Sequence, residues 1–194
     1  DIDAILAEDQ FVTCTSQFDF DHLGKFLDSD LTTDHVPEKT KLVLPMWAIS
    51  KWLTLSYVKI TSLPRSYSSR FLNNLEADPS HVNLRKKSPY FFLAGRWLVS
   101  LIRKQQQRGS NLEAATELQN ILLKLYTGSR FRQVLDWSMA TSGEEDHEHD
   151  EDNHLTTLET KLFRAGSSSM AASLKYRYYS RLQYSRPPKR QRLE

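Results

Sequence analysis

The sequence predicts a mainly α protein in which a helical bundle follows a small β-rich α/β domain. From residue 64 onward, apolar residues recur at helical spacing in one segment after another. Before that point, short alternating runs rich in aromatic and β-branched residues are separated by polar turns. A chain of 194 residues can hold one domain and a smaller companion. We therefore expect a first domain at 1–62, a helical domain at 63–184 and a polar tail at 185–194.

The first domain is predicted to mix strands with two short helices. Residues 2–6 suit one or two helical turns, and 11–13, 18–20, 41–44 and 57–60 read as strands. Residues 28–40 are polar and read as a loop. Pro45 stands where a helix favours its first residue, and a helix is expected to follow it.

The second domain is predicted to contain four to five helices. A helix over 65–77 ends before Pro79, because the residue before a proline avoids the α region. Ser88 followed by Pro89 indicates the start of the next helix, which Gly109 closes. Asn111 is expected to cap a third helix, and Gly128 to interrupt it. Gly166 and the serines after it are expected to break the last helical segment into two parts.

Composition excludes several classes of protein. The 26 Lys and Arg residues nearly balance 24 Asp and Glu, so the chain is not a uniformly basic nucleic-acid binder. Cys14 is the only cysteine, which excludes an intramolecular disulfide and fits a reducing compartment. The apolar runs are too short to span a membrane, so we expect no membrane partner.

Motifs for catalysis are missing, so we predict that the chain is not an enzyme and needs no cofactor. The six glycines form neither the GxGxxG nor the GxxxxGK[ST] phosphate-binding loop, and no GxSxG turn occurs. The segment from Glu144 to His154 contains His147, His149 and His154 with seven carboxylates, residue types that can bind a metal. Like charges this dense favour a solvated acidic loop, placed at 143–153, and no metal site is predicted.

The C-terminal end is basic: residues 161–194 contain nine Lys or Arg residues and one Glu. Tyrosines interleaved with arginines could follow a phosphate backbone and stack on bases, which makes a nucleic-acid-binding module the alternative function. However, Tyr178 continues a four-residue ladder with Met170, Leu174 and Leu182, which favours an amphipathic helix whose tyrosines pack inward or contact a partner. In the tail, Lys189, Arg190 and Arg192 resemble a nuclear-import signal.

Aromatic residues are the predicted partner interface. Trp47 and Trp52 lie five residues apart on one helix, at about 140° to each other, so they cannot face the same way. One of them is expected to face another domain or chain. The residues predicted to contact partners are Trp47, Trp52, Trp97, Tyr176 and Tyr179.

Several segments together resemble the Psf-three subunit family of GINS, a DNA-replication complex. Residues 42–47, LVLPMW, resemble that family's LxLPxW element, and 76–84, EADPSHVNL, followed by 88–91, SPYF, resemble its ADPxxVxL and xPxF elements. The segments 123–135 and 155–163 follow in the expected order. The resemblance covers nearly the whole chain.

The resemblance implies a β-rich B domain followed by a helical A domain. It further implies a nuclear heterotetramer with Sld-five, Psf-one and Psf-two. GINS joins the MCM ring and Cdc-forty-five as the CMG helicase and links it to DNA polymerase epsilon. ATP hydrolysis belongs to MCM in that assembly, so this subunit is expected to be a scaffold whose own DNA contact is weak or indirect.

Overall fold

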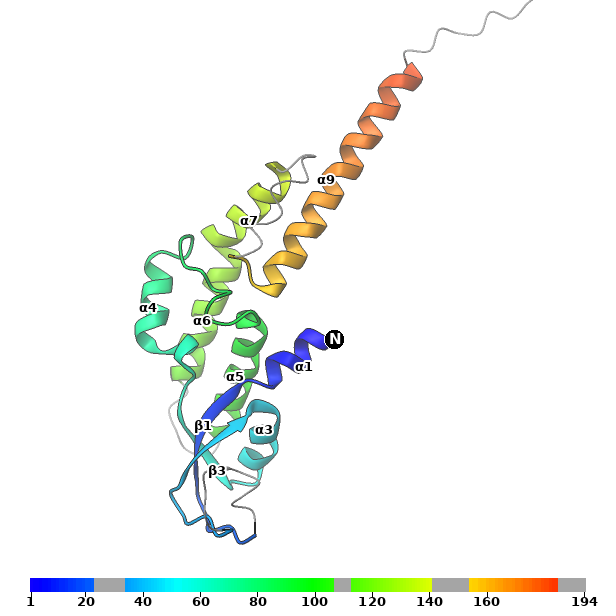
Figure 1. Cartoon of the computed structure of the whole chain (residues 1–194). Helices are drawn as coiled ribbons and strands as arrows, with labels where there is room; N and C mark the ends of the chain where they lie inside the picture. Colours follow the sequence, from blue (N-terminus) through cyan, green and yellow to red (C-terminus); the bar gives the residue numbers. More distant parts are fainter. Residues whose placement is uncertain (23–33, 107–112, 141–153, 185–194) are drawn as a thin grey trace, which may run out of the picture.

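The computed structural model of the chain describes residues 1–22, 34–106, 113–140 and 154–184. A small sheet and two short helices form the N-terminal part, and longer helices form the rest (Figure 1). The mainly α fold class is confirmed. The elements in chain order are α1 (Ile2–Glu8), β1 (Phe11–Ser16), β2 (Lys41–Pro45), α3 (Met46–Thr54), β3 (Val58–Ser62), the 3-10 helix η1 (Arg65–Tyr67), α4 (Ser69–Ala77), α5 (Phe91–Gln106), α6 (Glu113–Thr127), α7 (Ser129–Ala140) and α9 (Thr157–Tyr184).

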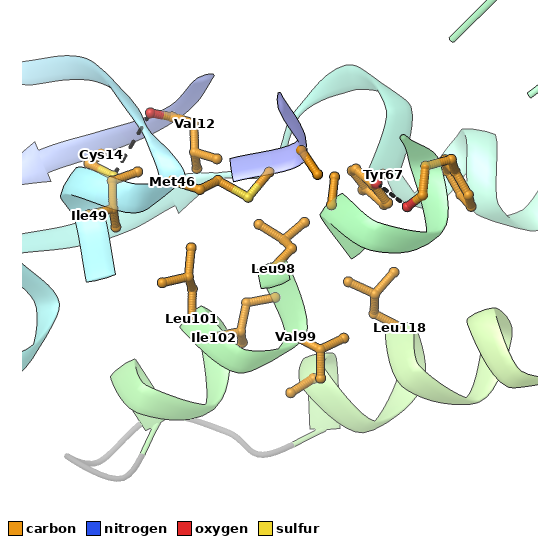
Figure 2. Close-up of a cluster of buried hydrophobic side chains, with 14 of the residues drawn as sticks. Val12, Cys14, Met46, Ile49, Tyr67, Leu98, Val99, Leu101, Ile102 and Leu118 are labelled. Atoms are coloured by element: carbon orange, nitrogen blue, oxygen red, sulfur yellow. Dashed lines mark hydrogen bonds between the residues drawn. The ribbon is translucent and has the colours of Figure 1, made fainter. Parts of the chain in front are cut away.

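Within the described part of the chain, the sheet has β1 at its centre, antiparallel to β2 on one side and to β3 on the other. The register places Cys14 opposite Leu42. Successive side chains of a strand point to opposite faces of the sheet. Val12 and Cys14 of β1 lie on the buried face, whereas Val43 of β2 lies on the other face and is exposed. α3 follows β2 directly and adds Met46 to the same buried cluster (Figure 2).

The central helix of the molecule is α5. It contacts α1, α3 and β3 from the N-terminal part and α6 from the bundle. α6 in turn contacts α7, and α9 packs against α7. The far half of α9 extends beyond the end of α7 (Figure 1).

One hydrophobic core connects the sheet with the bundle. Leu98 and Leu101 of α5 are fully buried and lie in the same cluster as Val12 and Met46 (Figure 2). Polar contacts also cross between the two parts: the Gln10 side-chain amide donates to the Ser88 hydroxyl at 2.6 Å. The predicted boundary at residues 62–63 coincides with the end of β3, but the core is shared across it, and the division into two domains stays a prediction.

The predicted break at Gly166 is wrong, because α9 is continuous from Thr157 to Tyr184. Gly166 has a packing role instead. A Cβ atom placed there would lie 2.8 Å from the Cβ of Ser138 on α7, and closer still to its hydroxyl. Only a residue without a side chain lets the two helices approach this closely.

Three other predicted helix boundaries differ from the structure. Pro45 is the extended last residue of β2, and the helix begins after it at Met46. The expected helix over 65–77 is divided, because Ser68 has extended backbone angles between η1 and α4. The helix expected from Ser88 begins at Phe91. The predicted interruption at Gly128 is confirmed, since α6 ends at Thr127.

Candidate functional site

Exposed apolar side chains are the main surface feature of the described residues, and they gather in three regions. One lies around α1, β1, β2 and α3, one on α6, and one on the far half of α9, and Met139 of α7 belongs to none of the three. The large hydrophobic residues exposed in the described ranges are Ile2, Ile5, Leu6, Phe11, Phe18, Val43, Trp47, Leu55, Tyr57, Leu123, Tyr126, Met139, Leu174, Tyr176, Tyr178 and Tyr179.

The far half of α9 carries three of these rings on a helix that is exposed all round. Tyr176, Tyr178 and Tyr179 are 75%, 63% and 54% exposed. Every residue from 171 to 179 is exposed, whereas Glu159 near the start of the helix is buried. We name residues 171–181 the α9 arm.

The prediction that Tyr178 packs inward is wrong. The α9 arm lies past the end of α7, the helix against which the first half of α9 packs (Figure 1). The ladder at four-residue spacing therefore has no surface of α7 to meet, and Leu174 is exposed as well. The side chain of Leu182, the last member of the ladder, lies outside the described residues.

The two tryptophans of α3 face in different directions, as their spacing predicts. Trp47 is 55% exposed, and its indole N–H donates to the Oδ1 atom of Asp9 at 3.1 Å. Trp52 is half-buried, and its ring centroid lies 5.6 Å from that of Phe20. Trp47 is thus the one that presents an apolar face to the surroundings.

Trp97 of α5 is half-buried and packs against the hydrophobic core. The structure therefore places the five predicted interface residues on three elements: α3, α5 and the α9 arm. Whether they contact partners stays a prediction.

A buried ion pair that sequence reasoning missed fixes α7 to the start of α9. Arg130 Nε donates to Glu159 Oε1 at 2.5 Å, and Arg130 Nη2 donates to Oε2 at 3.1 Å. Arg130 Nη1 also donates to the carbonyl oxygens of Pro79 and Val82, both at 2.8 Å. The guanidinium therefore connects three segments that are distant in sequence.

The sequence did contain a signal for one half of this cluster. Thr156 and Glu159 form a capping box, in which each side chain bonds the other residue's backbone N–H. The Thr156 hydroxyl also donates to Glu159 Oε2 at 2.9 Å. The pattern Thr-x-x-Glu before an apolar run predicts this cap, but nothing local predicts that Arg130 joins it.

Groups that could carry chemistry are few among residues 1–22, 34–106, 113–140 and 154–184. Burial raises the pKa of the Cys14 thiol to about 12, so the thiol is protonated at neutral pH and is a poor nucleophile. Within these ranges, no three His, Cys, Asp or Glu side chains gather to hold a metal ion. The structure likewise contains no helix in the described ranges that is long and apolar enough to cross a membrane.

Four predicted features lie outside the described residues. They are the acidic loop 143–153, the basic tail with Lys189, Arg190 and Arg192, the helix end at Gly109 and the helix cap at Asn111. His154, the last histidine of the acidic segment, is described, and its Nδ1 atom lies 2.9 Å from the side-chain nitrogen of Asn83. His154 therefore lies on the surface next to Arg130.

Known proteins resemble the chain along most of its length. The PSF3 N-terminal domain matches residues 1–54, and the GINS complex protein helical bundle domain matches residues 66–177. A protein of Phaeosphaeria nodorum named DNA replication complex GINS protein PSF3 is 34% identical over 110 residues, which are 54% of this chain and 60% of that protein. The chain thus spans about three-fifths of the length of that relative.

Proteins of the same name from vertebrates match over a longer region. The Xenopus laevis protein is 27% identical over 178 residues, which are 88% of this chain and 76% of that protein. The Homo sapiens protein is 26% identical over 180 residues, which are 87% of this chain and 75% of that protein. The helical-bundle domain matches more than half of the residues of this chain, and the PSF3 N-terminal domain matches its beginning. The chain therefore belongs to the PSF3 family of GINS complex proteins.

Proposed function

We propose that the chain is a non-catalytic scaffold subunit of a nuclear GINS heterotetramer with Sld-five, Psf-one and Psf-two. In this role it takes part in initiation and elongation of chromosomal DNA replication, within the CMG helicase that GINS forms with the MCM ring and Cdc-forty-five. Its link to DNA polymerase epsilon is indirect. The names of its relatives, DNA replication complex GINS protein PSF3, support this proposal.

The observation that carries the proposal is the number of large apolar side chains left in water. Single exposed hydrophobic residues are common on monomeric proteins, but groups of them are typical of surfaces that another protein covers. Phe11, Val43 and Trp47 are all exposed, and they come from adjoining parts of β1, β2 and α3. Aromatic side chains of this kind are enriched at the centres of protein interfaces.

The predicted interface residues differ in how well their surroundings suit this role. Trp47, Tyr176 and Tyr179 are more than half exposed and can lose a large apolar area on assembly. Trp52 and Trp97 are half-buried, so in this proposal they support the interface and offer one edge to a partner.

Co-expression tests the proposal. The chain is produced alone and together with Sld-five, Psf-one and Psf-two, and its mass is measured by size-exclusion chromatography with light scattering. We expect a complex with one copy of each subunit, and aggregation of the chain without its partners. A soluble, cooperatively folded monomer that ignores the other three subunits would contradict the proposal.

A second candidate function is nucleic-acid binding by the α9 arm. The exposure of the three tyrosines favours it, because these rings do not pack against α7. Lys175, Arg177 and Arg181 lie among the rings, and all three are exposed. Exposed rings and cations on one element suit single strands, whose bases stack on aromatic groups while phosphates meet the cations.

The salt dependence of binding separates the two candidates. If the arm binds nucleic acid, the affinity for a fluorescent single-stranded DNA falls steeply with salt concentration, and Arg177→Gln with Arg181→Gln reduces the slope by about two. Binding that is absent from the purified complex excludes this candidate and leaves the scaffold proposal intact.

A further inference from the structure

A groove between α5 and α6 has the form of a docking site for a helix. Its volume is about 420 Å³, and it is lined by residues of these two helices alone. Val99 is buried at its base, Leu122 is half-buried, and Leu123 on its wall is 51% exposed. The groove is therefore mainly apolar and open to solvent on one side, and Arg103 Nη2 of α5 donates to Gln119 Oε1 of α6 between its two sides.

The α5 side of the groove has the spacing of a helix–helix contact. Phe92, Arg96, Val99 and Arg103 line it, at intervals of four, three and four residues. Residues at these intervals lie along one face of an α-helix. This face differs from the one that carries Leu98 and Leu101, which packs against the N-terminal part.

The α6 side repeats this spacing. Gln119, Leu122, Leu123 and Tyr126 follow at intervals of three, one and three residues, which is again one helical face. The Tyr126 ring lies 5.9 Å from that of Phe92, edge to face, and so closes one end of the groove. Two parallel ridges with an apolar furrow between them are the surface that a third helix fills in a bundle.

The charges at the groove restrict its occupant. Among the described residues that line it, Arg96 and Arg103 are the charged ones, and both are exposed. They are seven residues apart on α5, which is about 10.5 Å at 1.5 Å per residue. A helix that lies along the groove can place carboxylates two turns apart against both guanidinium groups.

The charges and the apolar lining of the groove each disfavour one other occupant. A second copy of the chain, docked symmetrically through the same groove, would bring the arginines of both copies together. The acidic segment from Glu144 to Asp152 has suitable charges, but it contains no apolar residue to fill the furrow. The occupant must be apolar on one face and acidic along its edge.

We propose that the α5–α6 groove binds an amphipathic helix from another GINS subunit, with carboxylates about two turns apart that pair with Arg96 and Arg103. The inference rests on the proposed function and adds to it the place and chemistry of one contact. Leu123 and Tyr126 supply the apolar anchor, and the two arginines set the position of the helix along the groove.

Photo-crosslinking in the co-expressed complex tests this inference. Leu123 is replaced by p-benzoylphenylalanine, the purified complex is irradiated, and the crosslinked peptide is identified by mass spectrometry. We expect one product, with an acidic amphipathic helix of another subunit. A crosslink to a second copy of this chain, or to its own acidic segment, would overturn the inference.

Charge and apolar variants give an independent measurement. Leu123→Glu is expected to weaken assembly at least tenfold, and Arg96→Glu with Arg103→Glu to do the same. Met139→Glu alters an apolar residue of α7 that is 50% exposed and lies outside the groove, and it serves as the control, with less than a twofold effect. Circular dichroism of each purified complex shows whether the helices are retained.

The outcomes separate the two proposals. If the four wild-type subunits assemble, but position 123 forms no crosslink and the groove variants assemble as tightly as the wild type, the groove is unoccupied. In that case only this inference fails. If the wild-type chain forms no complex with the other subunits, the proposed function fails and this inference fails with it.

Discussion

Arg130 and Glu159 form a buried two-pronged ion pair that fixes the start of α9 to α7. Their side chains are 5% and 8% exposed, and each of the two Glu159 oxygens accepts from the guanidinium group. A charge buried to this extent is tolerated when it is paired and hydrogen-bonded, and both conditions hold here. The position of α9 therefore depends on both residues, and a substitution of either one should disturb it.

Glu159→Gln is predicted to loosen α9, because it leaves the Arg130 charge buried without its partner. We expect a loss of about 3–5 kcal/mol in the local opening free energy, measured by hydrogen–deuterium exchange of α7 and α9 in the assembled complex. Lys124→Ala, which breaks an exposed ion pair with Glu76, is the control and should cost about 1 kcal/mol or less. Equal effects of the two variants would contradict the role assigned to the buried pair.

Gly166→Ala is predicted to separate α7 from α9. Alanine favours a helix over glycine by about 1 kcal/mol, but the added methyl group overlaps Ser138, and such overpacking costs about 1–3 kcal/mol. The net effect is a loss of exchange protection in both helices. Ser168→Ala, at an exposed position of the same helix, controls for helix propensity.

The second-site variant Ser138→Gly makes this prediction specific. It removes the side chain that the new methyl group would meet, so the double variant should regain helix packing that Gly166→Ala alone loses. If the double variant is no better packed than the single one, the close approach of the two helices is not the reason for glycine at 166.

Cys14 is predicted to make the fold less stable at alkaline pH. Folding raises the pKa of the thiol from 9.0 to about 12, so the folded state holds its proton more tightly than the unfolded state. The resulting stability is complete below pH 9 and is lost as the pH rises from 9 toward 12. Cys14→Ala should flatten the fall in thermal stability between pH 8.5 and 10.5, and an unchanged slope would contradict the assignment.

Thiol labelling checks the burial of Cys14 by a separate route. Because the side chain is fully buried and protonated, a thiol reagent at pH 8 should react with it only as the protein opens. We expect labelling of the native complex to be much slower than labelling in 6 M urea.

Tyr176→Ala together with Tyr179→Ala is predicted to weaken assembly without changing the fold. Both rings are exposed, so their removal should change the stability of the chain by less than about 0.5 kcal/mol. Loss of an interface anchor costs about 2 kcal/mol or more in binding, which is measured by titrating the chain into its partners. Arg181→Ala, at an exposed charge on the same arm, is the matched control.

Patterns within one element were enough to predict most of the fold. The short run at 11–13 and the helical spacing of apolar residues after residue 64 are local signals, and the structure has the strand β1 and the helices from α4 to α9 at these places. They succeed because burial of one face sets the periodicity of the sequence.

The errors occur where a distant residue determines the local structure. Ser88 was expected to cap a helix, but its hydroxyl accepts from Gln10, 78 residues earlier, and the helix begins later. Gly166 was expected to break a helix because nothing local showed that Ser138 lies against it. Tyr178 was expected to turn inward because the sequence does not state where α7 ends relative to α9.

Because α9 extends far beyond its contact with α7, a small tilt at that contact moves the tip of the helix by a larger distance. From Gly166 to Tyr184 the helix continues for eighteen residues, which is about 27 Å. A tilt of about 5° at the Gly166–Ser138 crossing would displace the tip by roughly 2 Å, about the radius of a methyl group. Small adjustments beside a glycine would thus become movements large enough to engage or release whatever the tyrosines touch.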